Sequence, residues 1–312
     1  MATGCSGGQP SAAANPSPAP GRAFELELVV RTPAALRNVD EVQRLVDAAA
    51  VNGFGTVSLL VKQDEDGAIE SGRTYYPSAV APAAPGYADF DVLQAVLTRA
   101  HARGLRVKAW VPQFHDQASV RAHPGWAMQA LVAGRVVPYN GSRQNETFAN
   151  PLDEEVQRYQ LSVLREVASR YAVDGVMLDW IRFDDYPMDL GDATRARFKA
   201  LSGVDPIEID FKSDTPLRAR WNDFRTAEIA RYIAQVRAAL PSQLALGVYI
   251  LPPDFVEVGQ DAARFAADVQ QLAPMCYHSD WRFPLDWVWN RCLSSTVAKA
   301  GATAVAPTLG AN

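Results

Sequence analysis

The residues 173–187, VDGVMLDWIRFDDYP, join an apolar β-run to a group of acidic side chains. Asp179 ends the run, and the adjacent acids Asp184 and Asp185 follow in the next loop. Alternate residues of a strand face opposite sides, so Asp179 shares its side with Met177. In a barrel we expect this side to face the lumen, while the other side, which includes Trp180, faces the surrounding helices.

A lumen-facing carboxylate is costly to bury unless it is paired or hydrogen-bonded, and Arg182 is the nearest cation in the sequence. Asp179 and Arg182 could form an ion pair that only fixes the loop. Alternatively, Asp179 reacts with or binds a substrate while Arg182 keeps it ionised, which suits a nucleophile or base. Asp184 and Asp185 are predicted either to contact substrate or to lie at the solvated edge of the loop.

Three other predicted strands also end in aromatic or ionisable residues. Aromatic rings offer apolar faces to sugars and other ring-shaped substrates. Asp280 could act as a proton donor if a dry setting raised its pKa, or it could be a solvated acid. A histidine at a strand end is often structural, and a tryptophan can simply anchor a loop. With Arg182, Asp184 and Asp185, the residues expected to line a groove are Trp110, His115, Tyr249, Tyr277, His278 and Trp281.

The kinds of residue at these strand ends favour one type of chemistry. His, Cys and carboxylate residues show no zinc-ligand spacing, and neither a nucleophile-elbow serine motif nor a phosphate-binding loop occurs. We therefore expect no metal and no cofactor. Two carboxyl groups that act as acid and as base or nucleophile are what glycosidic bond cleavage needs. Asp179 is the predicted base or nucleophile, and Asp280 is the predicted acid.

The elements that would position these residues alternate along the chain. Apolar runs of strand length are followed by amphipathic helical patterns, which indicates parallel strands joined by right-handed crossovers. The long connections 64–89, 115–150 and 184–220 all follow strands, on the side where barrel enzymes build their sites. The predicted strands are Phe24–Arg31, Thr56–Val61, Arg106–Phe114, Asp174–Phe183, Leu244–Ile250, Leu272–Tyr277 and Ala302–Thr308, and the predicted helices are Asp40–Asn52, Phe90–Arg103, Asp153–Tyr171, Trp221–Leu240, Gln260–Gln270 and Leu285–Ala300.

Seven strands are one fewer than a closed (β/α)8 TIM barrel requires. We expect such a barrel without its eighth strand because the chain is truncated after strand seven, rather than a barrel that is open at one seam. A doubly wound sheet is the rival fold, but the first strand is not followed by the glycine pattern of dinucleotide-binding proteins.

Composition limits the remaining possibilities. With 312 residues, 48% of them hydrophobic, the chain can form one large barrel domain over residues 23–312. A net charge of −5 without a basic run argues against nucleic acid as a partner. Residues 1–22 are rich in Ala, Pro, Ser and Gly and predict a flexible tether.

The three cysteines are too few and too scattered for a disulfide framework. Cys276 and Cys292 are expected to be small buried side chains, although they could pair if the fold brought them together. Cys5 resembles the lipidated cysteine of a bacterial lipoprotein leader. The charged and apolar regions that normally precede it are missing, so the leader is cut short or Cys5 has no special role. Membrane contact is expected only through a lipid anchor at Cys5.

Several segments of the chain form a recognisable set. They are Pro77-Ser78, residues 102–110, Asn150-Pro151, residues 170–183, Trp221, Phe224-Arg225 and residues 274–277. Together they resemble the bacterial glycosyl-hydrolase-like family 10. The resemblance implies a (β/α)8-barrel lipoprotein of the cell envelope, periplasmic or at the surface, with glycosidase activity. The family's strand-four Asp and following Arg match Asp179 and Arg182, and its strand-six Tyr matches Tyr277.

The resulting hypothesis is a glycoside hydrolase that cleaves a bacterial envelope or extracellular polysaccharide. One alternative is a surface lipoprotein that binds polysaccharide without cleaving it. Another is a polysaccharide lyase, in which His115 and Tyr277 would be the base and the acid.

Overall fold

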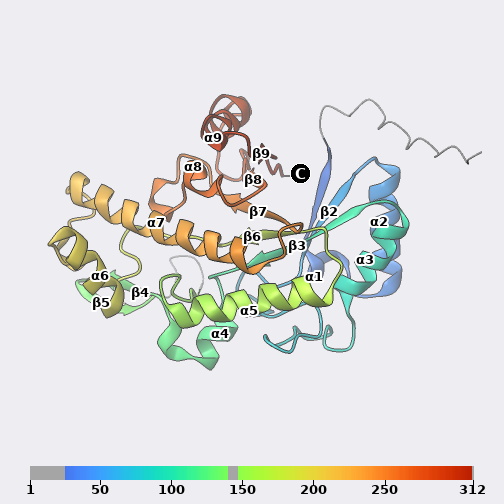
Figure 1. Cartoon of the computed structure of the whole chain (residues 1–312), viewed down its shortest axis with the longest axis horizontal. Helices are drawn as coiled ribbons and strands as arrows, with labels where there is room; N and C mark the ends of the chain where they lie inside the picture. The colour runs from blue at the N-terminus through green and yellow to red at the C-terminus, as the bar shows by residue number, and fades with distance from the viewer. Residues whose placement is uncertain (1–24, 140–146, 311–312) are drawn as a thin grey trace, which may run out of the picture.

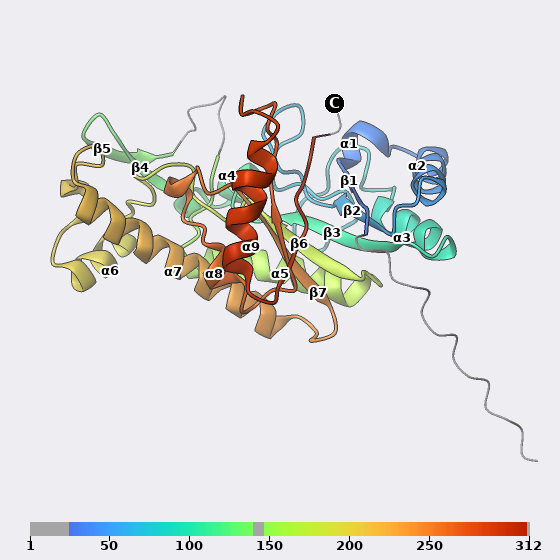
Figure 2. The same cartoon turned by 90° about the horizontal axis from the view of Figure 1, so that it is seen from above.

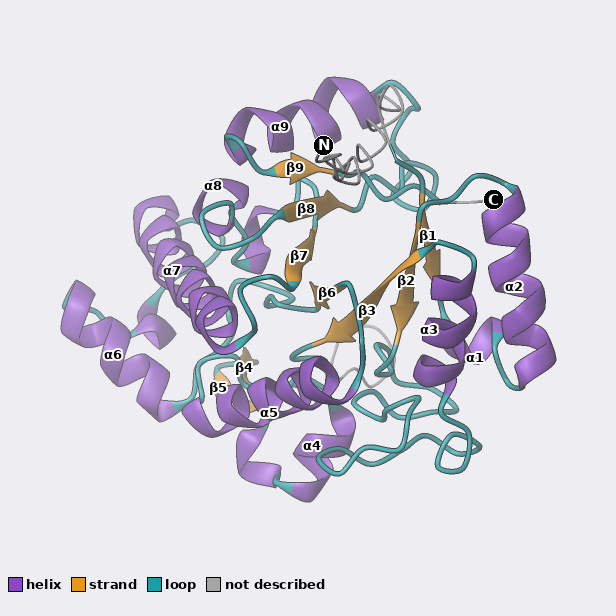
Figure 3. Ribbon diagram, turned by 45° about the vertical axis from the view of Figure 1, so that its right-hand side comes forward, coloured by secondary structure: helices purple, strands orange, loops and turns teal. Residues whose placement is uncertain are grey.

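The computed structural model describes residues 25–139 and 147–310; the predicted tether and Cys5 lie outside these ranges. Seven parallel strands form one curled sheet whose strand order follows the sequence, and helices surround it (Figure 3). Over the described residues, this arrangement confirms the predicted (β/α) barrel lacking an eighth strand. The strands are β1 (Glu27–Val30), β2 (Thr56–Leu60), β3 (Arg106–Pro112), β6 (Gly175–Asp179), β7 (Ala245–Ile250), β8 (Gln271–Pro274) and β9 (Ala304–Val305).

The covering helices pack apolar stripes against the outside of the sheet, as amphipathic helices do. Asn38 caps the first of them by accepting a hydrogen bond from the backbone N–H of Glu41, and Asp153 caps another through Glu155 and Val156. The covering helices are α2 (Val39–Val51), α3 (Val92–Ala102), α5 (Glu154–Arg170), α7 (Thr215–Ala239), α8 (Ala262–Phe265) and α9 (Ser294–Ala300).

Additional elements lie in the connections that follow the strands. The β4–β5 hairpin and α6 extend one end of the molecule, away from α2 and α3 (Figures 1 and 2). This places the extra chain length at the carboxyl edge of the sheet, as expected for the walls of a groove. These elements are α1 (Thr32–Ala35), α4 (Gln117–Ala122), β4 (Gln129–Val132), β5 (Arg135–Pro138) and α6 (Asp192–Ser202).

The last third of the chain differs most from the predicted elements. The predicted helix Gln260–Gln270 is only the four residues of α8, and β9 has only two residues. A π-helical segment, Val288–Leu293, precedes α9 where one continuous helix was expected. Within the described ranges, no helix is both long enough and apolar enough to cross a membrane.

Cys276 and Cys292 form a disulfide, so the expectation that they are separate buried thiols is wrong. The bond ties the segment after β8 to the π-helical segment. Around it lies a small apolar cluster that also contains Trp287 and Val288 and is distinct from the main core. A loop with so small a core of its own gains order from a covalent link.

Candidate functional site

A cavity of about 1900 Å³ opens at the carboxyl ends of the strands and continues down into the lumen. The lumen part is lined by residues such as Met177 of β6 and Lys108 of β3. The outer part is lined by the long connections, including Leu131 of the β4–β5 hairpin and Trp281 after β8. The predicted long connections therefore do form walls around the mouth of the barrel.

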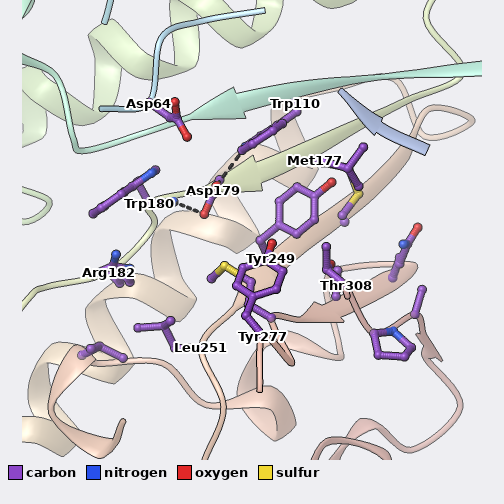
Figure 4. A pocket seen from close by; sticks show the side chains of 18 of the residues that line it. Asp64, Trp110, Met177, Asp179, Trp180, Arg182, Tyr249, Leu251, Tyr277 and Thr308 are labelled. Carbon is purple, nitrogen blue, oxygen red and sulfur yellow. Dashed lines mark hydrogen bonds between the residues drawn. The ribbon is translucent and has the colours of Figure 1, made fainter. Parts of the chain in front are cut away.

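Asp179 is the last residue of β6, and its buried carboxyl group lines the cavity. The indole Nε1 of Trp110 donates a hydrogen bond to its Oδ2 at 2.9 Å, and the backbone N–H of Trp180 donates to its Oδ1 at 2.7 Å (Figure 4). Burial raises the pKa of Asp179, while the hydrogen bond from Trp180, the charge of Arg182 and the bond from Trp110 oppose that rise. The charge of Arg182 thus favours the ionised form of Asp179, as the sequence predicted, although desolvation is the larger influence on the pKa.

Trp180 departs from the alternation of its strand. Its φ angle is +49°, in the left-handed region that bulky residues rarely adopt. The strand pattern predicted that Trp180 faces the helices. Its side chain lines the cavity instead. The guanidinium of Arg182 lies 4.1 Å from its ring centroid, which makes a cation–π contact.

Among the described residues, Arg182 pairs with Asp184 rather than with Asp179, which was its partner in one of the two sequence alternatives. Its Nη1 lies 3.6 Å from Oδ1 of Asp184, while its Nη1 also donates to the carbonyl of Phe183 at 3.2 Å. Arg182, Asp184 and Asp185 all line the cavity; Asp184 is half-buried and Asp185 is exposed. The loop after β6 therefore contributes both charge signs to the wall.

Asp64 is a buried carboxyl that the sequence reasoning missed. It follows β2, has a side-chain exposure of 1%, and lies 2.7 Å through Oδ2 from Nη1 of Arg31. Burial raises its pKa to about 7, against the charge of Arg31. The available signal was its position just beyond a buried strand, the same position that drew attention to Asp179.

Arg31 and Trp110 connect the two buried carboxyl groups. The Arg31 guanidinium lies 5.3 Å from the ring centroid of Trp110, whose indole N–H is bonded to Asp179. On its other side the same guanidinium contacts Asp64. Asp64, Trp110 and Asp179 surround one pocket in Figure 4. Two acids thus share a cavity wall with one cation and one indole.

Tyrosines complete the lumen side of the pocket. Tyr249 is buried and its hydroxyl lies 2.9 Å from Oγ of Ser58. Tyr277 lines the cavity after β8, and burial raises its pKa. Both rings lie near Asp179 in Figure 4. The prediction that Trp110, Tyr249 and Tyr277 reach a common groove thus corresponds to their positions.

The loop after β8 forms the outer wall. Trp281 lines the cavity and packs against Phe255 and Tyr277, with ring centroids 5.0 and 5.5 Å away. Asp280 also lines the cavity, but its side chain is exposed. The Cys276 disulfide fixes the start of this loop, so Trp281 is both a loop anchor and a wall residue.

His115 and His278 do not lie where they were predicted. Neither is among the described residues that line the cavity. His115 is fully buried, packs on Phe148 and Trp180, and lies 3.3 Å through Nε2 from Oδ2 of Asp66. His115 forms an isolated β-bridge with Phe148 of the long connection that follows, and its ring centroid lies 4.5 Å from that of Trp180. The lyase alternative therefore loses its proposed base.

A buried ion pair connects the segments that follow β2 and β3. Lys62 Nζ lies 2.7 Å from Oδ2 of Asp116, and neither side chain is exposed to solvent. Lys62 also donates to Gln160 Oε1 at 2.7 Å, and Asp116 caps α4 through the N–H of Ser119. The network ties the segment after β2 to α4 and α5. No cluster of three or more His, Cys, Asp or Glu residues in the described part of the chain could hold a metal ion.

A curled parallel sheet with carboxyl groups and aromatic rings at its carboxyl edge defines a (β/α)-barrel protein with an enzyme-like site. The profile of a family described as "Putative glycosyl hydrolase domain" matches residues 29–286, most of the chain. The chain belongs to this family. This confirms the resemblance to glycosyl-hydrolase-like proteins that the sequence motifs indicated.

Named relatives are similar over part of their length. An S-layer-related protein of Niallia circulans is 27% identical over 229 residues, which are 64% of this chain and 14% of that protein. Glycosyl hydrolase DigH of Escherichia coli is 31% identical over 176 residues, which are 50% of this chain and 35% of DigH. The chain thus matches about a third or less of each of these two relatives.

Solved structures share the fold. The glycoside hydrolase domain of PgaB (BpsB) from Bordetella bronchiseptica aligns with a TM-score of 0.69 at 17% identity, covering 89% of this chain and 82% of that one. A beta-galactosidase from Halorubrum lacusprofundi aligns with a TM-score of 0.58 at 17% identity, covering 81% of this chain and 40% of that one. At this identity the likeness establishes the barrel architecture alone.

Proposed function

We propose that the chain is a glycoside hydrolase that cleaves a saccharide polymer at the mouth of the barrel. The observation that carries this proposal is the buried carboxyl of Asp179, which lines the cavity between Trp110 and Trp180. Hydrolysis of a glycosidic bond needs carboxyl groups beside the anomeric carbon and apolar faces for the sugar rings. The family membership supports the same reaction class.

The dimensions of the cavity favour a polymer. At about 1900 Å³, its volume exceeds the roughly 300–1,000 Å³ of a site for one small ligand. Its walls carry aromatic side chains from several loops, including Trp180, Tyr139 and Trp281. Several sugar units could therefore stack along the walls while one bond lies at Asp179. We expect a bacterial envelope or extracellular polysaccharide as the substrate.

We further propose that the protein works in the cell envelope. The Cys276–Cys292 disulfide supports this location, because such bonds form and persist mainly in oxidising compartments. Lipidation of Cys5 stays a prediction, since Cys5 lies outside the described residues. Trapping free thiols by alkylation in source cells tests the location: an oxidised Cys276–Cys292 pair is expected, and a fully reduced pair would contradict it.

A panel of bacterial polysaccharides, assayed for new reducing ends, tests the reaction. The wild-type chain should release reducing ends from at least one polymer, and Asp179→Asn should reduce that rate by a factor of 100 or more (about 2.7 kcal/mol). Asp89→Asn is the matched control, because Asp89 is exposed in the β2–α3 connection and does not line the cavity. If the protein binds a polymer but releases no new reducing ends, the binding-only alternative is favoured instead.

A further inference from the structure

Asp64 has the features of a reacting group rather than of a structural one. It lines the cavity, it is buried, and its Oδ2 receives no hydrogen bond of good geometry within the described structure despite the ion pair with Arg31. A buried carboxyl that only held Arg31 in place would be expected to have both oxygens satisfied. Apart from its ion-pair contact with Arg31, Oδ2 of Asp64 is thus available, within the described structure, for a hydrogen bond with a substrate.

We propose that Asp64 is the proton donor of glycosidic bond cleavage and that Asp179 is the carboxylate that acts with it. This inference rests on the proposed function and deepens it by naming the second carboxyl. Asp64 follows β2 and Asp179 ends β6, with β3 and its Trp110 between them in the sheet. The two acids therefore approach the cavity from different strands, with Trp110 between them.

The hydrogen bonds distinguish the roles of the two acids. Both oxygens of Asp179 accept N–H hydrogen bonds, which stabilise the ionised form. Asp64 contacts the partly exposed guanidinium of Arg31 and its own backbone N–H, and among the described residues its Oδ2 accepts no hydrogen bond of good geometry. Because two nearby carboxyl groups resist ionising together, the ionisation of Asp179 helps to keep Asp64 protonated.

The groups that face Asp64 all influence its protonation. Burial, Glu65 and Asp179 raise its pKa to about 7, whereas Arg31, just after the end of β1, and the backbone N–H of Asp64 lower it. Asp64 in turn contributes to the raised pKa of Tyr75 and Tyr277. A proton donor with a pKa near the working pH is suited to general acid catalysis.

Asp280, the acid expected from the sequence, fits this role less well. Its side chain is exposed on the outer wall, where water solvates the carboxylate. Asp64 is enclosed and interacts electrostatically with Asp179. Asp280 would then contact a sugar unit away from the cleaved bond.

In the proposed step, the bond between the anomeric carbon and the glycosidic oxygen breaks, and its electron pair goes to that oxygen. The oxygen takes the proton of Asp64 and leaves as an alcohol. One water molecule supplies the oxygen that bonds to the anomeric carbon, and the proton it loses goes to Asp179. Solvent exchange then returns the proton from Asp179 and restores the proton on Asp64. One water is consumed for each bond, and no oxidant or cofactor is needed.

The dependence on the leaving group tests the role of Asp64. On the polysaccharide that the wild type cleaves, Asp64→Asn should be at least 100-fold slower. On a dinitrophenyl glycoside of the same sugar, whose leaving group needs no proton, its loss should be less than 10-fold. Asp179→Asn should lose both activities, and Asp89→Asn should lose neither. Equal losses on both substrates with Asp64→Asn, or an undiminished rate on the polysaccharide, would overturn the proposal.

A second readout comes from Arg31→Met. Without the guanidinium the pKa of Asp64 rises further, so the alkaline limb of the pH–rate profile should move to higher pH. A limb that stays in place would contradict the role of Asp64. Titration of the Asp64 carboxyl by ¹³C NMR, assigned by its absence in Asp64→Asn, gives the same answer without a substrate: a midpoint near 7 is expected, and one near 4 refutes the proposal. If the wild type cleaves no polymer, the proposed function fails first, and both inferences are rejected together.

Discussion

The indole Nε1 of Trp110 lies 2.9 Å from Oδ2 of Asp179, so a strand β3 side chain holds the carboxyl of the neighbouring strand β6. Because this hydrogen bond opposes the rise in the pKa of Asp179, Trp110→Phe should raise that pKa further. If Asp179 must be ionised to act, the acid limb of the pH–rate profile will move to higher pH. The rate on the alkaline side of the limb should fall about 10-fold, the effect of a hydrogen bond to a charged group worth ~1.5 kcal/mol.

Trp126→Phe provides the control for this change. Trp126 also donates its indole N–H to a carboxylate, Glu155 at 3.2 Å, but it does not line the cavity. The two variants lose the same chemical group. Matching shifts of the acid limb in both would show that the effect does not pass through Asp179.

The buried Lys62–Asp116 pair should be essential for stability. Lys62→Met leaves the Asp116 carboxylate buried without its cation, which should cost about 3–5 kcal/mol of unfolding free energy. The double variant Lys62→Met/Asp116→Leu should recover part of this loss because no buried charge remains. Urea denaturation followed by circular dichroism measures both, and Arg99→Met at the partly exposed pair with Asp47 should cost much less. A double variant no more stable than the single one would argue against an unpaired charge as the cause.

Loss of the disulfide should affect the loop after β8 more than the barrel. The bond closes a loop over a sequence separation of 16, and its removal in Cys276→Ser/Cys292→Ser should cost about 3 kcal/mol. Saccharide affinity should fall because Tyr277 and Trp281 lose their fixed position, while Asp179 keeps its hydrogen bonds. Calorimetry with and without dithiothreitol measures the effect. A reductant-sensitive melting temperature in the double variant would point to another cause.

The pH dependence of stability should report on Asp64. Its folded-state pKa of about 7 exceeds the unfolded value of 3.8, so the protonated form is stabilising below pH 4 and that stability is lost as pH rises through 7. The loss amounts to several kcal/mol, at about 1.4 kcal/mol for each pKa unit. Asp64→Asn removes this dependence. In denaturation experiments, the free energy of unfolding of the variant should therefore rise relative to that of the wild type between pH 4 and 8. Curves that run parallel for Asp64→Asn and the wild type would place the pKa of Asp64 near its ordinary value.

The fold could be predicted from local patterns because each barrel unit repeats the same signal. Apolar runs such as Gly175 to Leu178, followed by acids, mark strand ends, and amphipathic spacing marks the helices. The same patterns also located Asp179, because the alternation of side chains along a single strand determines which face its carboxyl is on. The partners of Arg182 could not be deduced, because a loop conformation, not sequence distance, sends its guanidinium onto Trp180.

Other parts of the site depend on contacts between distant segments. Asp64 and Arg31 meet only because β1 and β2 are adjacent, and neither looked exceptional in its own segment. His115 carried a catalytic-looking residue type, but the chain after β3 folds over it and buries it. The Cys276–Cys292 pair likewise required the π-helical segment to return to the end of β8.

The left-handed backbone at Trp180 has a consequence for how the barrel uses its strands. In a regular strand only every second side chain points into the lumen of the barrel, so the side chains of neighbouring residues normally lie on opposite faces. With φ at +49°, the carboxyl of Asp179 and the indole of Trp180 both line the cavity from consecutive positions. The carboxyl of Asp179 and the flat apolar face of the Trp180 indole are thereby held by adjacent backbone positions. If a sugar ring stacks on that indole, the position of the ring relative to the Asp179 carboxyl is set by the single peptide unit that joins the two residues.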